Sequence, residues 1–247
     1  MVFKPLPRED NIELVLKMTN YLEDNILDLK NKMIVRFLDL YNIFNKDNKE
    51  ELIREYIGKC YDEELPELPK KLKKIRIRWN KGNDVFMDHI SAYLYHSWPE
   101  DVKEITCYVG LLPTSVRNLE NFTLYIDMNL DIDVAMHEIA DQCCQFIYYD
   151  KWKKMFPTTT KEDFEYPSLI WKLSRMATDP ILNCNVVNKT FGNYECNHKT
   201  YDYFYNEENK HVIKYIKEIY LRDDIDLSIP NSYEYVKKEW ADNEKET

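Results

Sequence analysis

The residues best suited to do chemistry lie in the segment Met136-His137-Glu138-Ile139-Ala140-Asp141. The segment lies in a mostly apolar stretch, and the pattern predicts a helix. Residues four apart share one helix face, so His137 and Asp141 are placed to ligate one metal ion. Glu138 follows directly, where a general base acting on metal-bound water would lie. The ordinary alternative is a buried helix that carries these residues without a metal.

This segment resembles the His-Glu-x-x-His motif of zincin metallopeptidases, with Asp141 in place of the second His. The layout resembles the gluzincin, thermolysin-like branch and its small single-domain members over residues 105–205. In that branch a downstream helix supplies a Glu ligand, and an Asp four residues later orients the first zinc His. By this resemblance Asp179 matches the orienting Asp, whereas the ligand Glu falls at Arg175.

The departure at Arg175 changes the expected chemistry. A guanidinium is a permanent cation that cannot ligate a metal and would repel one. Under the geometry that the resemblance implies, Asp141 and Arg175 approach each other from facing helices, where a carboxylate and a guanidinium can pair. We therefore predict an Asp141–Arg175 ion pair that replaces the metal as the link between the two helices.

Two functions follow from this resemblance. The first is a metallopeptidase-derived protein with a degraded zinc site, catalytically inactive and without a cofactor, that binds a peptide or protein at a sheet edge. The alternative is an active metal-dependent peptidase. In that case zinc is held by His137, Asp141 and a third ligand not identified here, and Glu138 is the catalytic base.

The elements that would position these residues are mostly helical. Prolines in the stretch 64–69 disfavour continued helix and indicate a boundary. We predict helices at 12–29, 33–44, 50–61, 85–95, 131–153, 167–182 and 210–222, and strands at 105–112 and 121–129.

These elements predict an α+β protein in which a small mixed sheet packs on the helix of the motif, as in zincins. The expected organisation is a helical N-terminal part at 1–64, a zincin-like domain at 70–222 and a helical tail at 223–247, or one continuous domain. The whole chain of 247 residues is long enough for a substantial core.

The stretch 70–78 carries six Lys and Arg residues. It could bind an anionic partner, but a solvated face is the simpler interpretation, because apolar residues fall between the charges. Ile75, Ile77 and Trp79 alternate as they would in a strand.

The composition argues against several classes of binding partner. The net charge of −10 argues against nucleic acid, whose binding needs clustered cations. Four glycines leave no Gly-rich phosphate loop or dinucleotide fingerprint. The first residues lack the apolar stretch of a secretory signal, and no apolar run is long enough to span a membrane. We expect a cytoplasmic protein with reduced cysteines that does not bind membranes.

Other residues offer weaker candidates. Cys144 follows His137 by two helical turns, too far for easy joint ligation, and such a cysteine is more often a small buried side chain. Cys196 and His198 form a Cys-x-His pair that could begin a metal site. Such a site needs two further ligands, and Cys184 is the sole obvious neighbour. His89 and His96 are expected to serve packing or the surface. Aromatic residues at 201–205 suit either a substrate groove or a core.

Overall fold

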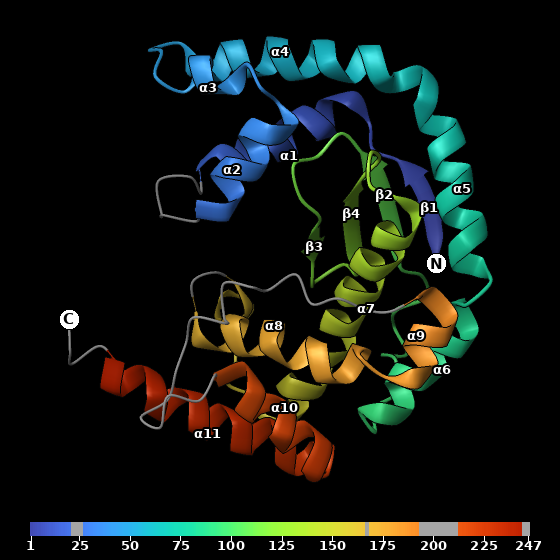
Figure 1. Ribbon diagram of the computed structural model, residues 1–247, viewed down its shortest axis with the longest axis vertical. Helices are drawn as coiled ribbons and strands as arrows, with labels where there is room; N and C mark the ends of the chain where they lie inside the picture. The colour runs from blue at the N-terminus through green and yellow to red at the C-terminus, as the bar shows by residue number, and fades with distance from the viewer. Residues whose placement is uncertain (21–26, 166–167, 193–211, 244–247) are drawn as a thin grey trace. The chain divides into compact units, whose positions relative to one another are not determined.

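The computed structural model describes residues 1–20, 27–165, 168–192 and 212–243. Helices predominate, and four short strands form one mixed sheet (Figure 1), which confirms the α+β class. Two compact units make up the fold. The first comprises Met1–Lys81 and Glu104–Ile139, and the second comprises Gly82–Lys103 and Ala140–Thr247. The division falls inside the helix that carries the motif.

The sheet lies entirely in the first unit. Its strands are β1 (Val2–Pro5), β2 (Thr106–Gly110), β3 (Val116–Asn118) and β4 (Thr123–Asp127), in the spatial order β1-β2-β4-β3. β1 and β4 both run parallel to β2, whereas β3 runs antiparallel to β4. The strands predicted at 105–112 and 121–129 are confirmed with narrower bounds, and β1 and β3 were not predicted.

Burial explains why the central strands hold together. Cys107, Leu124 and Ile126 have no exposed surface, so one face of β2 and β4 is fully covered. On the other face Tyr108 and Tyr125 are register partners with stacked rings whose centroids lie 5.5 Å apart. Thr123 and Asp127, at the two ends of β4 on this second face, are also buried.

Helices surround this sheet within the first unit. They are α1 (Arg8–Asn20), α2 (Leu27–Arg36), α3 (Leu40–Ile43), α4 (Lys49–Glu64) and α5 (Leu68–Asn80), with a short 3₁₀ turn η1 (Leu65–Glu67) between the last two. α1 packs on α4, and α5 runs alongside β1 (Figure 1). The predicted break at 64–69 is thus observed as the turn between α4 and α5.

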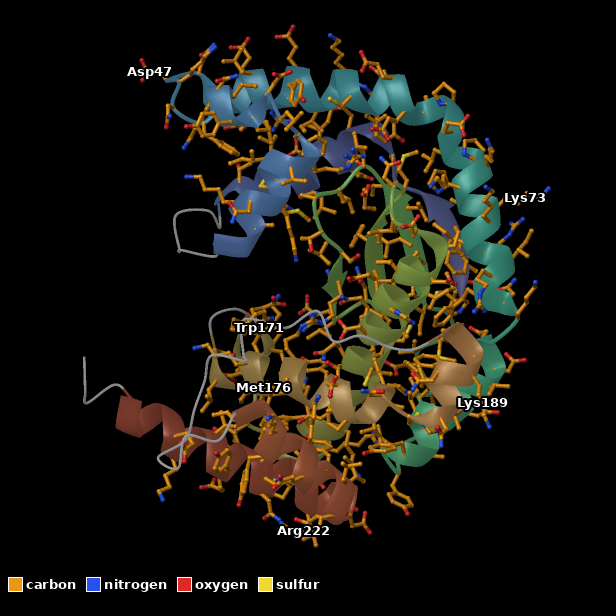
Figure 2. All side chains as sticks on the ribbon, viewed as in Figure 1. Asp47, Lys73, Trp171, Met176, Lys189 and Arg222 are labelled. Carbon is orange, nitrogen blue, oxygen red and sulfur yellow. The ribbon has the colours of Figure 1, made fainter. Side chains whose placement is uncertain are left out.

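The alternation at Ile75, Ile77 and Trp79 was misleading, because α5 is a helix through all three positions. Leu68, Ile75 and Trp79 are buried at helical spacing, while Ile77 is 48% exposed. Helical burial of this stripe therefore outweighs the strand-like alternation. The Lys and Arg residues between them lie largely on the exposed side, and Figure 2 shows Lys73 pointing away from the sheet.

A buried amide joins α1 to the end of β2. Asn11 has no exposed surface; its Nδ2 donates to the Leu111 carbonyl at 2.9 Å, and the Leu111 N–H donates to Asn11 Oδ1 at 2.7 Å. Gly110 lies beside this contact, and a Cβ built there would lie 2.5 Å from Asn11 Oδ1. The absence of a side chain at Gly110 lets α1 approach the strand this closely.

The second unit is helical in its described residues. Its elements are α6 (Asn83–Tyr93), the later part of α7 (Ile132–Met155), the 3₁₀ turn η2 (Glu162–Phe164), α8 (Leu169–Leu182), α9 (Asn185–Phe191), α10 (Val212–Arg222) and α11 (Ile225–Asn243). α8 packs against α10 and α11 (Figure 1). Trp152 has no exposed surface and contacts the rings of Phe156, Phe164 and Tyr233, which ties α7 to η2 and α11.

α7 is the longest helix in the described part of the chain, with 24 residues. Asp133 lies in its first turn and Lys153 and Lys154 in its last, charges that suit the helix dipole. Neither α7 nor any other helix in the described ranges is both long and apolar enough to cross a membrane.

Candidate functional site

α7 begins at Ile132, one residue after the predicted start of the helix, and β4 ends at Asp127, two residues before the predicted end of the strand. Nearly every residue from Ala135 to Trp152 is buried, so this helix is enclosed by the fold on most sides. A helix held in this way presents its polar residues in fixed positions. His137, Glu138 and Asp141 therefore lie on one continuous helix.

His137 and Glu138 are half-buried and belong to the part of α7 assigned to the first unit. Asp141 lies one helical turn after His137, on the part of α7 assigned to the second unit, and is 4% exposed. The predicted helical spacing of the motif is thus present. Both His137 and Glu138 have interaction partners in the structure.

Asp141 and Arg175 are brought together in the second unit. Arg175 Nη1, on α8, donates to Asp141 Oδ2 at 2.7 Å. The Asp141 side chain is 6% exposed and the Arg175 side chain 13% exposed, so the pair is largely withdrawn from solvent. In such surroundings an ion pair is screened far less than at the surface.

Amide side chains add to this contact between α7 and α8. Gln142 Nε2 lies 3.3 Å from Asp141 Oδ2, so this oxygen accepts from two donors. One turn further, Gln145 Nε2 donates to the Ser174 carbonyl at 2.8 Å, and both residues are fully buried. The polar contact between α7 and α8 therefore extends over about one turn of α7 and involves two consecutive residues of α8.

Asp179, the residue matched to the orienting Asp, is 3% exposed and lies one turn after Arg175 on α8. Its Oδ2 lies 2.5 Å from Lys217 Nζ of α10, whose side chain is 37% exposed. The Asp179 carboxylate thus faces a cation from a third helix. The orienting role toward His137 stays a prediction.

Cys144 has no exposed surface. Burial raises the pKa of its thiol well above the ordinary value, the charge of Asp141 and the neighbouring Cys143 raise it further, and Arg175 offsets part of this rise. The thiol therefore stays protonated near neutral pH. Cys144 is therefore a small buried side chain of α7, as such a cysteine most often is.

The donor set does not fit a catalytic zinc. Such a site needs three ligating side chains and an open position for water. At the three positions that the resemblance implies, Arg175 cannot ligate and instead binds the carboxylate that would serve as the second ligand. Within the described ranges, no group of three or more His, Cys, Asp or Glu residues is arranged to hold a metal ion.

One contact escaped the sequence reasoning. Cys184 Sγ lies 3.1 Å from His89 Nε2, although the two residues are 95 positions apart. The two residues do not form a short sequence motif, so no spacing in the sequence could have predicted their contact. The other weak candidates, Cys196, His198 and the aromatic residues at 201–205, lie outside the described residues.

Comparison with known proteins adds no family. No family model matches the chain, and no curated protein or solved structure matches it.

Proposed function

We propose that this chain is a metallopeptidase-derived protein in which the Asp141–Arg175 ion pair stands in for zinc, and that it binds a peptide or protein segment without hydrolysing it. The observation that carries the proposal is the 2.7 Å contact between Arg175 Nη1 and Asp141 Oδ2. The guanidinium supplies a positive charge beside the carboxylate, as a metal would, and it joins the same two helices.

The surroundings of the pair support this role. A buried carboxylate with no cation beside it is strongly unfavourable, so loss of a metal ligand set has to be compensated by another charge. Arg175 provides that charge, and Gln142 adds a second donor to the same oxygen. An ion pair held in this way links α7 and α8 without any need for a metal.

The sheet supports the binding part of the proposal. β3 stands at one end of the strand order and is antiparallel to β4, and its three residues are partly exposed. An edge strand can accept an extended peptide as a further strand, with main-chain hydrogen bonds supplying affinity. A cytoplasmic location belongs to the same proposal, because the five described cysteines are free thiols.

The inactive-site proposal is tested by restoring the ligands. The double variant Asp141→His, Arg175→Glu recreates the donor set of the motif, so we expect about one zinc per chain after purification without chelator and in zinc-containing buffer. Wild-type protein treated in parallel should hold far less than one. The triple variant with His137→Ala controls for adventitious binding and should lose the zinc. A folded double variant that binds no zinc would count against the derived-site geometry.

The same zinc measurement distinguishes the alternative function. If wild-type protein itself carries about one zinc per chain, lost in His137→Ala, the chain is a metal-dependent peptidase candidate. Glu138→Gln should then abolish hydrolysis of a peptide library while zinc is retained, because Glu138 would be the base. That result would overturn the inactive-site proposal.

Peptide binding is tested separately. Peptides selected from a random library against the wild-type chain should lose binding when alternate backbone nitrogens are N-methylated, because methylation removes the main-chain donors of an added strand. Equal affinity of the methylated and unmethylated peptides would rule out β-augmentation.

A further inference from the structure

The contact between Cys184 and His89 lies apart from the motif and belongs wholly to the second unit. Cys184 is the residue directly before α9, and its side chain is partly exposed. His89 is partly exposed on α6. Cys184 Sγ and His89 Nε2 lie 3.1 Å apart, within hydrogen-bonding distance for a sulfur atom.

The packing of α6 on α9 fixes this contact. The rings of Phe86 and Phe191, both without exposed surface, lie 5.5 Å apart between the two helices. Gly82 allows the close approach, since a Cβ there would lie 2.2 Å from the Thr190 methyl group. His89 is therefore carried to Cys184 by a packed helix.

The backbone of Cys184 is held on both sides. Its N–H donates to the Leu182 carbonyl at 2.9 Å, and its carbonyl accepts from the Asn188 N–H at 2.9 Å. The His89 ring also lies 6.2 Å from the Tyr93 ring, which limits its movement. The sulfur and the imidazole are thus both placed by their surroundings.

We propose that His89 activates the Cys184 thiol through their 3.1 Å contact, and that Cys184 is a modification site that reacts with low-molecular-weight disulfides. A cysteine next to a histidine is a common arrangement for a reactive thiol, because the imidazole takes up the thiol proton. Cys184 as a residue is partly exposed, so it lies where a small reagent can reach it.

The reaction is a thiol–disulfide exchange. The proton of the Cys184 thiol moves to His89, and the thiolate attacks one sulfur of the reagent disulfide. The S–S bond of the reagent breaks as the new S–S bond to Cys184 forms, and the second sulfur leaves as a thiolate that takes up the proton. Cys184 is oxidised, and one half of the reagent is reduced to a free thiol.

The charge environment agrees with this geometry. Burial is the largest influence and raises the pKa of the Cys184 thiol, but His89 and the backbone N–H groups of Val187 and Val186 together outweigh it, so the net pKa is lowered. Among the described residues, Tyr93 of α6 also interacts electrostatically with Cys184, and burial raises the pKa of Tyr93 to about 12, so it stays uncharged near neutral pH.

Other cysteines of the chain provide internal controls. Cys60 is also partly exposed, but burial raises the pKa of its thiol. Burial likewise raises the pKa of Cys143 and Cys144, which have no exposed surface. Cys60 is therefore the matched comparison, since it is also partly exposed but has no histidine that lowers the pKa of its thiol.

The test exposes the folded full-length chain to oxidised glutathione at pH 7 and follows each cysteine by peptide mass spectrometry, so that Cys196 is scored separately. We expect Cys184 to form the mixed disulfide about tenfold faster than Cys60. Equal rates at the two positions would overturn the proposal.

His89 is proposed to affect the reaction by changing the ionisation of the Cys184 thiol, so its test measures the pH dependence of the reaction as well as the rate. The pH midpoint for alkylation of Cys184 by iodoacetamide should lie below that of Cys60 in the wild-type chain. In His89→Gln it should move upward, and the reaction at pH 7 should slow about tenfold. His96→Gln, which removes a histidine that contacts Asp150 instead, should leave Cys184 unchanged. An unshifted midpoint in a folded His89→Gln chain, or a wild-type midpoint equal to that of Cys60, contradicts the pairing.

Discussion

The Asp179 carboxylate of α8 lies 2.5 Å from Lys217 Nζ of α10 and is almost completely buried. One turn earlier on α8, Arg175 reaches Asp141 of α7. α8 therefore forms one ion pair with α7 and another with α10. These two ion pairs make the stability of the second unit sensitive to the removal of a single charge.

The Asp141–Arg175 pair should behave as one coupled unit. Either Asp141→Ala or Arg175→Ala alone leaves the partner's charge largely buried, and we expect each to lower the free energy of unfolding by about 3–5 kcal/mol. The double variant removes both charges and should cost clearly less than the sum. Urea unfolding of the four proteins measures this coupling.

Additive losses would show that the two side chains contribute independently, and the idea that the pair acts as a link would then fail. Lys153→Met is a suitable reference variant, because it removes one exposed charge from α7 about three helical turns away from Asp141.

The Asp179–Lys217 pair should be asymmetric. Lys217→Met leaves the buried Asp179 carboxylate without its cation, so we expect a loss of about 3 kcal/mol in the free energy of unfolding. Asp179→Asn leaves Lys217, which is 37% exposed and can turn toward water, so a loss of about 1 kcal/mol is expected.

Thermal or urea unfolding of the two single variants checks this order. Lys214→Met, at an exposed position of the same helix, controls for removing a lysine from α10. The reverse order, with Asp179→Asn the more damaging, would mean that Asp179 stabilises the unit through contacts other than Lys217.

Ionisation of Asp127 should make the folded chain less stable as the pH rises. Burial raises its pKa above the ordinary 3.8, and the charge of Arg36 and the N–H groups of Leu112 and Asn129 offset only part of this rise. The folded chain thus binds this proton more tightly than the unfolded chain. The stabilisation is complete below about pH 3.8 and is lost as the pH rises through the raised pKa.

Asp127→Asn cannot ionise, so its stability relative to wild type should improve between pH 4 and pH 7. Urea unfolding at the two pH values measures the change. Asp88→Asn, at an exposed position, controls for the loss of one negative charge. A relative stability of Asp127→Asn that falls over this range would show that the interaction with Arg36 dominates over burial.

The buried amide of Asn11 should be costly to remove. Asn11→Ala leaves both the N–H and the carbonyl of Leu111 without their partner, and we expect a loss of about 2–4 kcal/mol. Asn80→Ala, at the exposed end of α5, should change stability by less than about 0.5 kcal/mol. Equal effects in chemical denaturation would mean that water replaces the amide at Leu111.

Much of the fold was predictable because periodicity carries local information. The helices around residues 136 and 175, and the strands before the first of them, follow from apolar spacing alone. β1 was missed because four residues with a terminal proline carry no alternating pattern, and β3 because three residues are too few. At α5 the apolar residues fitted both the two-residue period of a strand and the 3.6-residue period of a helix. Which of them the chain adopts depends on which residues are buried in the fold.

The candidate site shows the same limit. The resemblance suggested where Asp141 and Arg175 would meet, and the structure brings them to 2.7 Å. Nothing in the spacing suggested that Lys217 would face Asp179 or that His89 would reach Cys184, because both contacts join residues from helices far apart along the chain. Such pairings depend on how helices pack, which one sequence does not encode in any short pattern.

The parallel pairing of β1 with β2 has a consequence for biosynthesis. Val2 pairs with Thr106, and Asn11 bonds to a residue 100 positions later, so β1 leaves the ribosome without a strand partner until the chain has grown past β2. Closing so long a loop is slow, and an unpaired strand is open to wrong partners meanwhile. The helices between the two strands are therefore expected to form first, and the nascent sheet to be completed late.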